Sequence, residues 1–156
     1  MSSLHQFSLP SPLLKRGFWL YVWKIRGQTG PPTFYVGMTG DTGSHTAQSP
    51  MNRVGAHLGH NERSNALRRY LKSKGIALES CHDLQFAAYG PLGNVPEDKE
   101  LYRLARAKIA AVEKALWLDM EAAGLKMLNE CPRCRTNHEA AAFAAVRNAF
   151  APFLRN

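Results

Sequence analysis

The chain has 156 residues, of which 45% are hydrophobic and 21% are charged. This length and composition are typical of one compact soluble domain and exclude a chain that is disordered throughout. No apolar stretch reaches the ~18 residues of a membrane span, and the N-terminal segment lacks the pattern of a secretory signal. We therefore expect a cytoplasmic protein with no membrane partner.

Basic residues outnumber acidic residues by 20 to 12, which gives a formal net charge of +8. Ten basic and two acidic residues lie in residues 1–75, whereas residues 76–156 contain ten of each. One-sided positive charge is expected of a protein that binds nucleic acid, because each neutralised phosphate releases counterions. The alternatives are a basic surface without a partner or one that meets anionic lipid.

The N-terminal half predicts two strands and two helices. A Ser/Pro-rich stretch over residues 1–16 predicts a flexible arm. Residues 18–25 are aromatic and β-branched with little alternation, which predicts a strand buried on both faces. Residues 33–38 predict a second strand that forms a hairpin with the first. Ser49 and Pro50 begin a helix to about residue 60, and a basic helix follows over about 64–74.

The C-terminal half predicts one more strand and two more helices. The strand covers residues 83–89, a long helix follows over about 96–123, and an Ala-rich helix over 139–150 closes the chain. The predicted order is β-β-α-α-β-α-α. We therefore expect a small α+β domain in which helices flank a three-stranded antiparallel sheet.

Polar residues of types that are common in catalytic and binding sites occur on three of these elements. Tyr21 and Tyr35 lie in adjacent predicted strands, and Gly37 leaves space beside Tyr35 for a backbone or a ligand. Arg53 and His57 lie four residues apart on one helix face, where they suit a phosphate. Packing of the tyrosines and a solvated basic helix face are the simpler readings.

The long helix carries a carboxylate among apolar neighbours. Residues 109, 110, 116 and 117, which flank Glu113 at helical spacing, are all apolar. A carboxylate on such a face costs free energy unless it is paired or bound to metal, and one carboxylate with substrate phosphates is a common way to hold Mg²⁺. Pairing with Arg106, or simple exposure to solvent, would also explain it. Asn129 follows the helix and could brace a turn.

In this order, these residues resemble the GIY-YIG nuclease family over about residues 17–129. The first family triplet corresponds to Trp19-Leu20-Tyr21, which departs from the family's glycine and isoleucine, and the second to Tyr35-Val36-Gly37. The resemblance implies an endonuclease that hydrolyses nucleic-acid phosphodiesters with one divalent ion, Mg²⁺ or Mn²⁺.

The resemblance also implies a role for each site residue. Tyr21 would be the general base, and Tyr35 would position the attacking water and the phosphate. Arg53 would stabilise negative charge on the phosphoryl oxygens, and His57 would assist proton transfer or bind phosphate. Glu113 would be the metal ligand. Gly37 and Asn129 would support the site. A phenol has a pKa of ~10, so Tyr21 needs metal or Arg53 to lower it.

The second predicted helix adds basic side chains that could contact DNA. Arg68, Arg69 and Lys72 would meet phosphates together with Arg53, while Leu67 and Leu71 would face the core. Such phosphate contacts position DNA without reading its sequence. RNA is not excluded as a partner.

Cys131, Cys134 and His138 suggest a zinc site as a minor alternative, because a Cys-x-x-Cys pair supplies half of a structural zinc centre. Cys81 or His82 would have to complete it. Two reduced cysteines in a loop are the simpler reading.

We therefore expect a flexible arm over 1–16, a nuclease domain over 17–130, and a Cys-containing link with a closing helix over 131–156 packed on the same domain. The expected function is a stand-alone DNA endonuclease, nucleoid-associated if bacterial, and dimerisation would let it cut both strands. The alternatives are a non-catalytic nucleic-acid-binding module of the same fold and a zinc-stabilised interaction protein.

Overall fold

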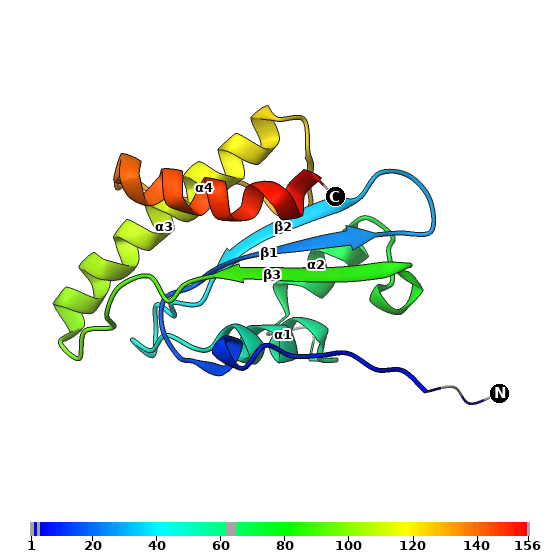
Figure 1. The fold of residues 1–156 in the computed structure, drawn as a ribbon, viewed down its shortest axis with the longest axis horizontal. Helices are drawn as coiled ribbons and strands as arrows, with labels where there is room; N and C mark the ends of the chain where they lie inside the picture. Colours follow the sequence, from blue (N-terminus) through cyan, green and yellow to red (C-terminus); the bar gives the residue numbers. More distant parts are fainter. Residues whose placement is uncertain (1, 3, 62–64, 156) are drawn as a thin grey trace.

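The computed structural model describes residues 2, 4–61 and 65–155. Within this part of the chain, a four-stranded sheet separates two pairs of helices (Figure 1). The strands are β1 (Leu20–Arg26), β2 (Thr33–Met38), β3 (Asp83–Tyr89) and β4 (Lys126–Met127). The helices are α1 (Pro50–Leu58), α2 (Ala66–Ser73), α3 (Lys99–Ala122) and α4 (Ala140–Arg155), with short 3₁₀ turns at Ser11–Leu14 and Leu78–Ser80.

Strand β1 is central and nearly all of its side chains are buried, as the sequence predicted. It pairs antiparallel with β2 on one side and with β3 on the other. Tyr21 lies opposite Gly37, and Trp23 lies opposite Tyr35. Since side chains alternate between the faces of a sheet, these four positions share one face.

The prediction of a three-stranded antiparallel sheet missed a fourth, parallel strand. After α3 the chain returns beside β2 and forms β4, which pairs in parallel through Thr33 with Lys126 and Phe34 with Met127. Two residues are too short to show a strand pattern in the sequence. In the described chain β4 covers only the beginning of β2, so the edge at Tyr35–Met38 is left for other groups.

Each face of the sheet has its own apolar core. On one face Trp23 and Ile25 pack with Leu67 and Leu71 of α2, which are fully buried as predicted. On the other face Leu20, Val22 and Phe34 pack against α3 and α4, including Leu116, Met120, Val146 and Phe150. In Figure 1, α3 and α4 lie together on one side of the sheet and α1 on the other.

The helix boundaries follow local chemistry. Ser49 caps α1 by accepting a hydrogen bond from the Asn52 backbone N–H, as its sequence position predicted. Asp98 caps α3, so this helix begins later than the predicted residue 96. The predicted start of α2 at residue 64 lies outside the described residues. Helix α4 continues past Pro152 to Arg155, because burial of its last turn against the core compensates for a weak helix former.

In the described residues, no helix is both long and apolar enough to cross a membrane.

Candidate active site

One cavity of about 300 Å³ brings together the five predicted catalytic residues. Tyr21 comes from β1, Tyr35 from β2, Arg53 and His57 from α1, and Glu113 from α3. These residues are up to 92 positions apart in the chain, so only the tertiary fold can assemble them. The cavity lies at the part of the β2 edge that β4 leaves uncovered.

Gly37 allows the two tyrosines to lie side by side. A Cβ atom at position 37 would collide with the ring carbons and the hydroxyl of Tyr21, which crosses directly over this glycine. The Tyr21 and Tyr35 rings lie nearly parallel, with their centroids 6.4 Å apart. The glycine of the second triplet therefore makes room for the tyrosine of the first.

Tyr21 and His57 form a buried polar pair. The Tyr21 hydroxyl lies 3.2 Å from Nε2 of His57, and both side chains are almost completely buried. Within the described residues, Nδ1 of His57 is buried and has no hydrogen-bond partner. The backbone carbonyl of His57 accepts a hydrogen bond from the Asn65 side chain, which holds the end of α1 in place.

Burial controls the protonation of this pair. Burial, and next the nearby Arg53 charge, lower the pKa of His57 to about 4, so its imidazole is neutral at pH 7. Burial, reinforced by Tyr35, raises the pKa of Tyr21 well above its usual value, although Arg53 acts in the opposite direction. Arg53 therefore lowers the pKa of Tyr21, as expected from the sequence, but burial raises it by more. A protonated phenol donates its hydrogen bond to Nε2 of a neutral imidazole when the ring proton is on Nδ1.

Tyr35 is also protonated. Burial, with the Glu113 carboxylate as the next cause, raises the pKa of Tyr35 to about 12. Its ring meets the His57 ring edge-on, with centroids 5.2 Å apart. Tyr35 can therefore orient a ligand as a hydrogen-bond donor at neutral pH.

Arg53 reaches the cavity with its charge already balanced. One terminal nitrogen forms a short ion pair with Asp41, which lies in the loop between β2 and α1. The Nε of Arg53 is buried without a hydrogen-bond partner in the described part of the chain. Because the guanidinium lines the cavity and is not fully used by Asp41, it can donate hydrogen bonds to an anionic oxygen there.

Glu113 is a half-buried carboxylate with no ion-pair partner among the described residues. The predicted alternative of a direct pair with Arg106 is therefore absent there. Burial raises the pKa of Glu113 to about 7, although the more distant charges of Arg106 and Arg53 lower it. A buried carboxylate whose charge is not balanced in this way is suited to bind a cation.

Two further charged residues in the cavity, Asp41 and Arg106, were not assigned to the site from the sequence. Arg106 precedes Glu113 by seven residues, which is two helical turns, so spacing alone could have placed both on one face. Its Nε donates to the Gly40 carbonyl oxygen at 2.9 Å. Asp41 lies in a loop without periodicity, and no sequence signal links it to Arg53.

The loop that carries Asp41 is fastened to α3. The buried Tyr102 hydroxyl lies 2.9 Å from the carbonyl oxygens of both Asp41 and Thr46. Together with the Arg106 bond to Gly40, this contact fixes the rim of the cavity to the helix that carries Glu113.

Asn129 braces the open edge of β2. Its side-chain oxygen accepts from the Val36 N–H at 3.3 Å, and its side-chain nitrogen donates to the Val36 carbonyl at 3.0 Å. The Asn129 carbonyl in turn accepts a hydrogen bond from the Trp117 indole. The side chain therefore takes the place of a strand partner at Val36, between Tyr35 and Gly37.

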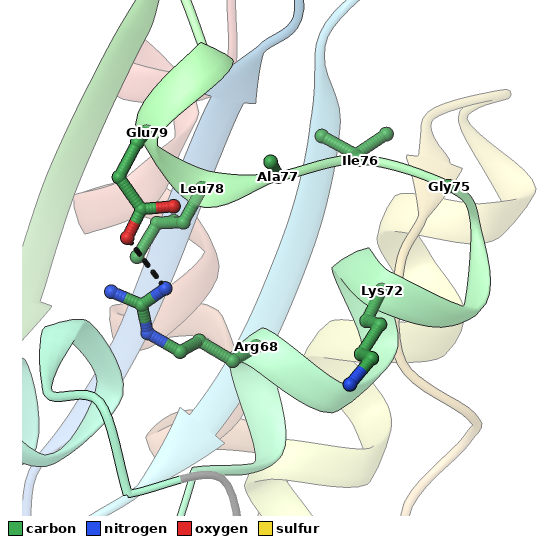
Figure 2. Close-up of a pocket in the computed structure, with 7 residues that line it drawn as sticks. All are labelled: Arg68, Lys72, Gly75, Ile76, Ala77, Leu78 and Glu79. Carbon is green, nitrogen blue, oxygen red and sulfur yellow. Dashed lines mark hydrogen bonds and ion pairs between the residues drawn. The ribbon is translucent and has the colours of Figure 1, made fainter.

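The predicted DNA-binding residues of α2 differ in their surroundings. Arg68 donates to the carbonyls of Leu58 and Gly59 and forms an ion pair with Glu79 at 2.7 Å (Figure 2). It therefore joins the end of α1 to the segment after α2. Arg69 and Lys72 are exposed, and Lys72 projects separately from the Arg68–Glu79 pair.

The cysteines do not gather around a metal position. In the described residues no three His, Cys, Asp or Glu side chains lie close enough to hold an ion. Cys131 packs against the core, the Cys134 thiol contacts the Ala107 carbonyl, and the His138 ring stacks edge-on with Phe143. Cys81 belongs to the opposite core, away from Cys131.

Comparison with known protein families, with curated proteins and with solved structures finds no match to this chain.

Proposed function

We propose that this chain is a metal-dependent endonuclease that hydrolyses DNA phosphodiester bonds through a GIY-YIG-type site. The observation that supports it best is the convergence of Tyr21, Tyr35, Arg53, His57 and Glu113 on one cavity. Their order along the chain suggested the family, and their shared cavity is an independent requirement that a chance resemblance would have no reason to meet.

The chain's own residues divide the chemistry between proton transfer and charge stabilisation. Tyr21 takes a proton from the attacking water as its own hydroxyl proton passes to Nε2 of His57, 3.2 Å away. Tyr35 donates a hydrogen bond that orients the water or the phosphate. Arg53 lines the cavity and offers its guanidinium to a phosphoryl oxygen, where negative charge increases in the transition state.

Glu113 is the residue that would hold a divalent ion, Mg²⁺ or Mn²⁺. Its half-buried carboxylate lacks a partner in the described chain, so a cation would offset its burial. With one protein carboxylate, most ligands would be waters and phosphate oxygens, as is common for Mg²⁺. When bound, the ion supplies Lewis-acid activation of the phosphate.

Exposed basic residues on α2 support DNA as the substrate. Exposed Arg69 and Lys72 on α2 offer phosphate contacts, whereas Arg68 has a structural role that leaves it little capacity for them. An intracellular location, and a homodimer that cuts both strands, belong to the same proposal.

The test is cleavage of supercoiled plasmid at low salt with Mg²⁺ or Mn²⁺. We expect nicked or linear products that disappear with chelator and with Glu113→Gln, and that persist with Glu121→Gln, which changes an exposed carboxylate of the same helix. Cleavage that survives Glu113→Gln would overturn the metal assignment. A folded protein that binds plasmid, branched and genomic DNA without cutting any of them would overturn the enzymatic proposal in favour of a binding module.

A further inference from the structure

Three arginines near the site use their nitrogen donors very differently. All three nitrogens of the Arg68 guanidinium are engaged by protein oxygens, from Leu58, Gly59 and Glu79. Arg53 has one terminal nitrogen on Asp41 and an unused Nε. Arg106 uses only Nε, on the Gly40 carbonyl. In the described part of the chain, no ion pair and no hydrogen bond involves its terminal nitrogens.

Among the residues that the structure describes, Arg106 has no direct counterion. The lining contains two acidic and two basic residues, namely Asp41, Glu113, Arg53 and Arg106. Asp41 is committed to Arg53 through a short ion pair. Glu113 affects Arg106 only at longer range, because they do not approach within ion-pairing distance. Arg106 is therefore the cavity cation that is most available to an anion.

The orientation of Arg106 is defined at one end. Its Nε bond to Gly40 fixes the guanidinium beside the loop between β2 and α1, with the cavity in front of it. The terminal nitrogens of such a guanidinium present a planar pair of donors, which matches two oxygens of one phosphate group.

We propose that Arg106 is a second phosphate-binding residue of the site, which grips a backbone phosphate of the nucleic-acid strand that enters the cavity. This inference rests on the proposed function for the nature of the ligand. Arg106 supplies binding and positioning, whereas Arg53 stabilises charge at the reacting phosphate. The competing explanation is that Arg106 only tethers the loop, for which a single bond to Gly40 suffices.

The test compares DNA binding by Arg106→Gln, Arg106→Lys and Arg103→Gln. Arg103 lies one turn earlier on α3, has a 67% exposed side chain and pairs with exposed Glu100. Arg103→Gln therefore removes the same charge from the same helix without touching the cavity. Binding of a duplex oligonucleotide in chelator is measured across salt concentrations, so no cleavage is required.

We expect Arg106→Gln to weaken binding about tenfold at low salt and to reduce the slope of log K against log salt by about 1, as for one lost phosphate contact. Arg106→Lys should recover most of that slope because it restores the charge. Arg103→Gln should leave the slope unchanged. Thermal unfolding of each variant checks that loss of the Arg106 bond to Gly40 has not destabilised the protein and so weakened DNA binding.

Three outcomes would overturn the inference. Equal slopes for wild type and Arg106→Gln would show that this side chain contacts no phosphate. An equal loss of DNA binding in Arg103→Gln would assign the effect to the overall positive charge of α3 and not to a contact in the cavity. Failure of the wild-type protein to bind the oligonucleotide would show that nucleic acid is not the ligand of Arg106. Loss of binding by Arg106→Gln in a protein that never cleaves DNA would instead support this inference and refute only the enzymatic proposal.

Discussion

The hydroxyl of Tyr21 lies 3.2 Å from Nε2 of His57, although 36 residues separate them in the chain. Burial opposes a charge on either group, because it raises the pKa of the phenol and lowers that of the imidazole to about 4. The pair is thus neutral at rest. In the proposed reaction Tyr21 takes a proton from water as it passes its own to Nε2, so a positive charge forms on His57 and must be offset by the negative charge that develops at the phosphate. Such a pair is difficult to explain by packing alone.

Removal of the Tyr21 hydroxyl should abolish proton transfer without disturbing the fold. Tyr21→Phe keeps the ring over Gly37, so we expect cleavage to fall about 10²- to 10⁴-fold while DNA affinity stays within about twofold. The matched control is Tyr70→Phe, whose ring lies 6.1 Å from that of Tyr35. Single-turnover cleavage and DNA binding measure the two quantities. More than a tenth of wild-type activity in Tyr21→Phe would contradict the proton-transfer role.

The close approach of Tyr21 to Gly37 predicts a steric effect. Gly37→Ala places a methyl group where the Tyr21 ring lies, and overpacking of this kind costs about 1–3 kcal/mol of unfolding free energy. Gly55→Ala is the control, because its new methyl meets nothing within 4 Å and removes a glycine from α1. That control should be stabilised by about 0.5–1 kcal/mol. Urea denaturation measures the free energy of unfolding of both variants. Equal values for Gly37→Ala and Gly55→Ala would refute the steric argument.

The carboxylate of Glu113, which has no ion-pair partner in the described part of the chain, predicts an unusual dependence of stability on pH. Burial raises its pKa from 4.5 to about 7 in the folded protein, so the folded state binds the proton more tightly than the unfolded chain. Stability is therefore lost as pH rises from about 4.5 to 7, by at most about 3 kcal/mol. Without metal, Glu113→Gln should be more stable than wild type near pH 8 and equal to it near pH 4.

Denaturation of both proteins in chelator at the two pH values tests this expectation. The exposed Glu121→Gln variant should follow wild type at both. If Glu113→Gln is no more stable than wild type near pH 8, the carboxylate is compensated in solution. Its proposed role as a cation ligand would then lose its physical basis.

The sequence predicted those parts of the site whose geometry depends on the spacing of residues close together in the chain. Four-residue spacing placed Arg53 and His57 on one face of α1, and a carboxylate among apolar helical neighbours marked Glu113. The strands at 33–38 and 83–89 were also correct, because their residues are strand formers bounded by turns. In each case the decisive information lay within a few residues.

The remaining features depend on contacts between distant segments. The pairing of Asp41 with Arg53 requires a loop conformation that α3 imposes through Tyr102. The structural role of Arg68 depends on carbonyls at the end of α1, which no pattern in α2 reveals. Likewise β4 exists because α3 returns the chain to the β2 edge, and its two residues carry no strand signature.

A buried lysine was also absent from the sequence expectations. Lys24 is 2% exposed in the centre of β1, and its ammonium donates a long hydrogen bond of 3.5 Å to the Phe153 carbonyl of α4. It also lies about 6 Å from the centroids of the Phe34 and Phe153 rings. Burial, and next the nearby Arg26, lower the pKa of Lys24, so its ammonium loses a proton more readily in the folded protein than in the unfolded chain.

Replacement of Lys24 by an apolar residue of similar length should therefore be tolerated. At pH 7 we expect Lys24→Met to equal wild type or exceed it by about 1 kcal/mol, because Met keeps the packing and removes a buried charge. Lys24→Ala should lose about 2–4 kcal/mol through the cavity it leaves. Since the folded-state pKa of Lys24 is lowered, wild-type stability should rise with pH in the alkaline range, and its difference from Lys24→Met should narrow. Urea denaturation at neutral and alkaline pH measures both effects. A Lys24→Met variant clearly less stable than wild type at pH 7 would mean that the ammonium–carbonyl bond outweighs the cost of burial and holds the end of α4 on the sheet.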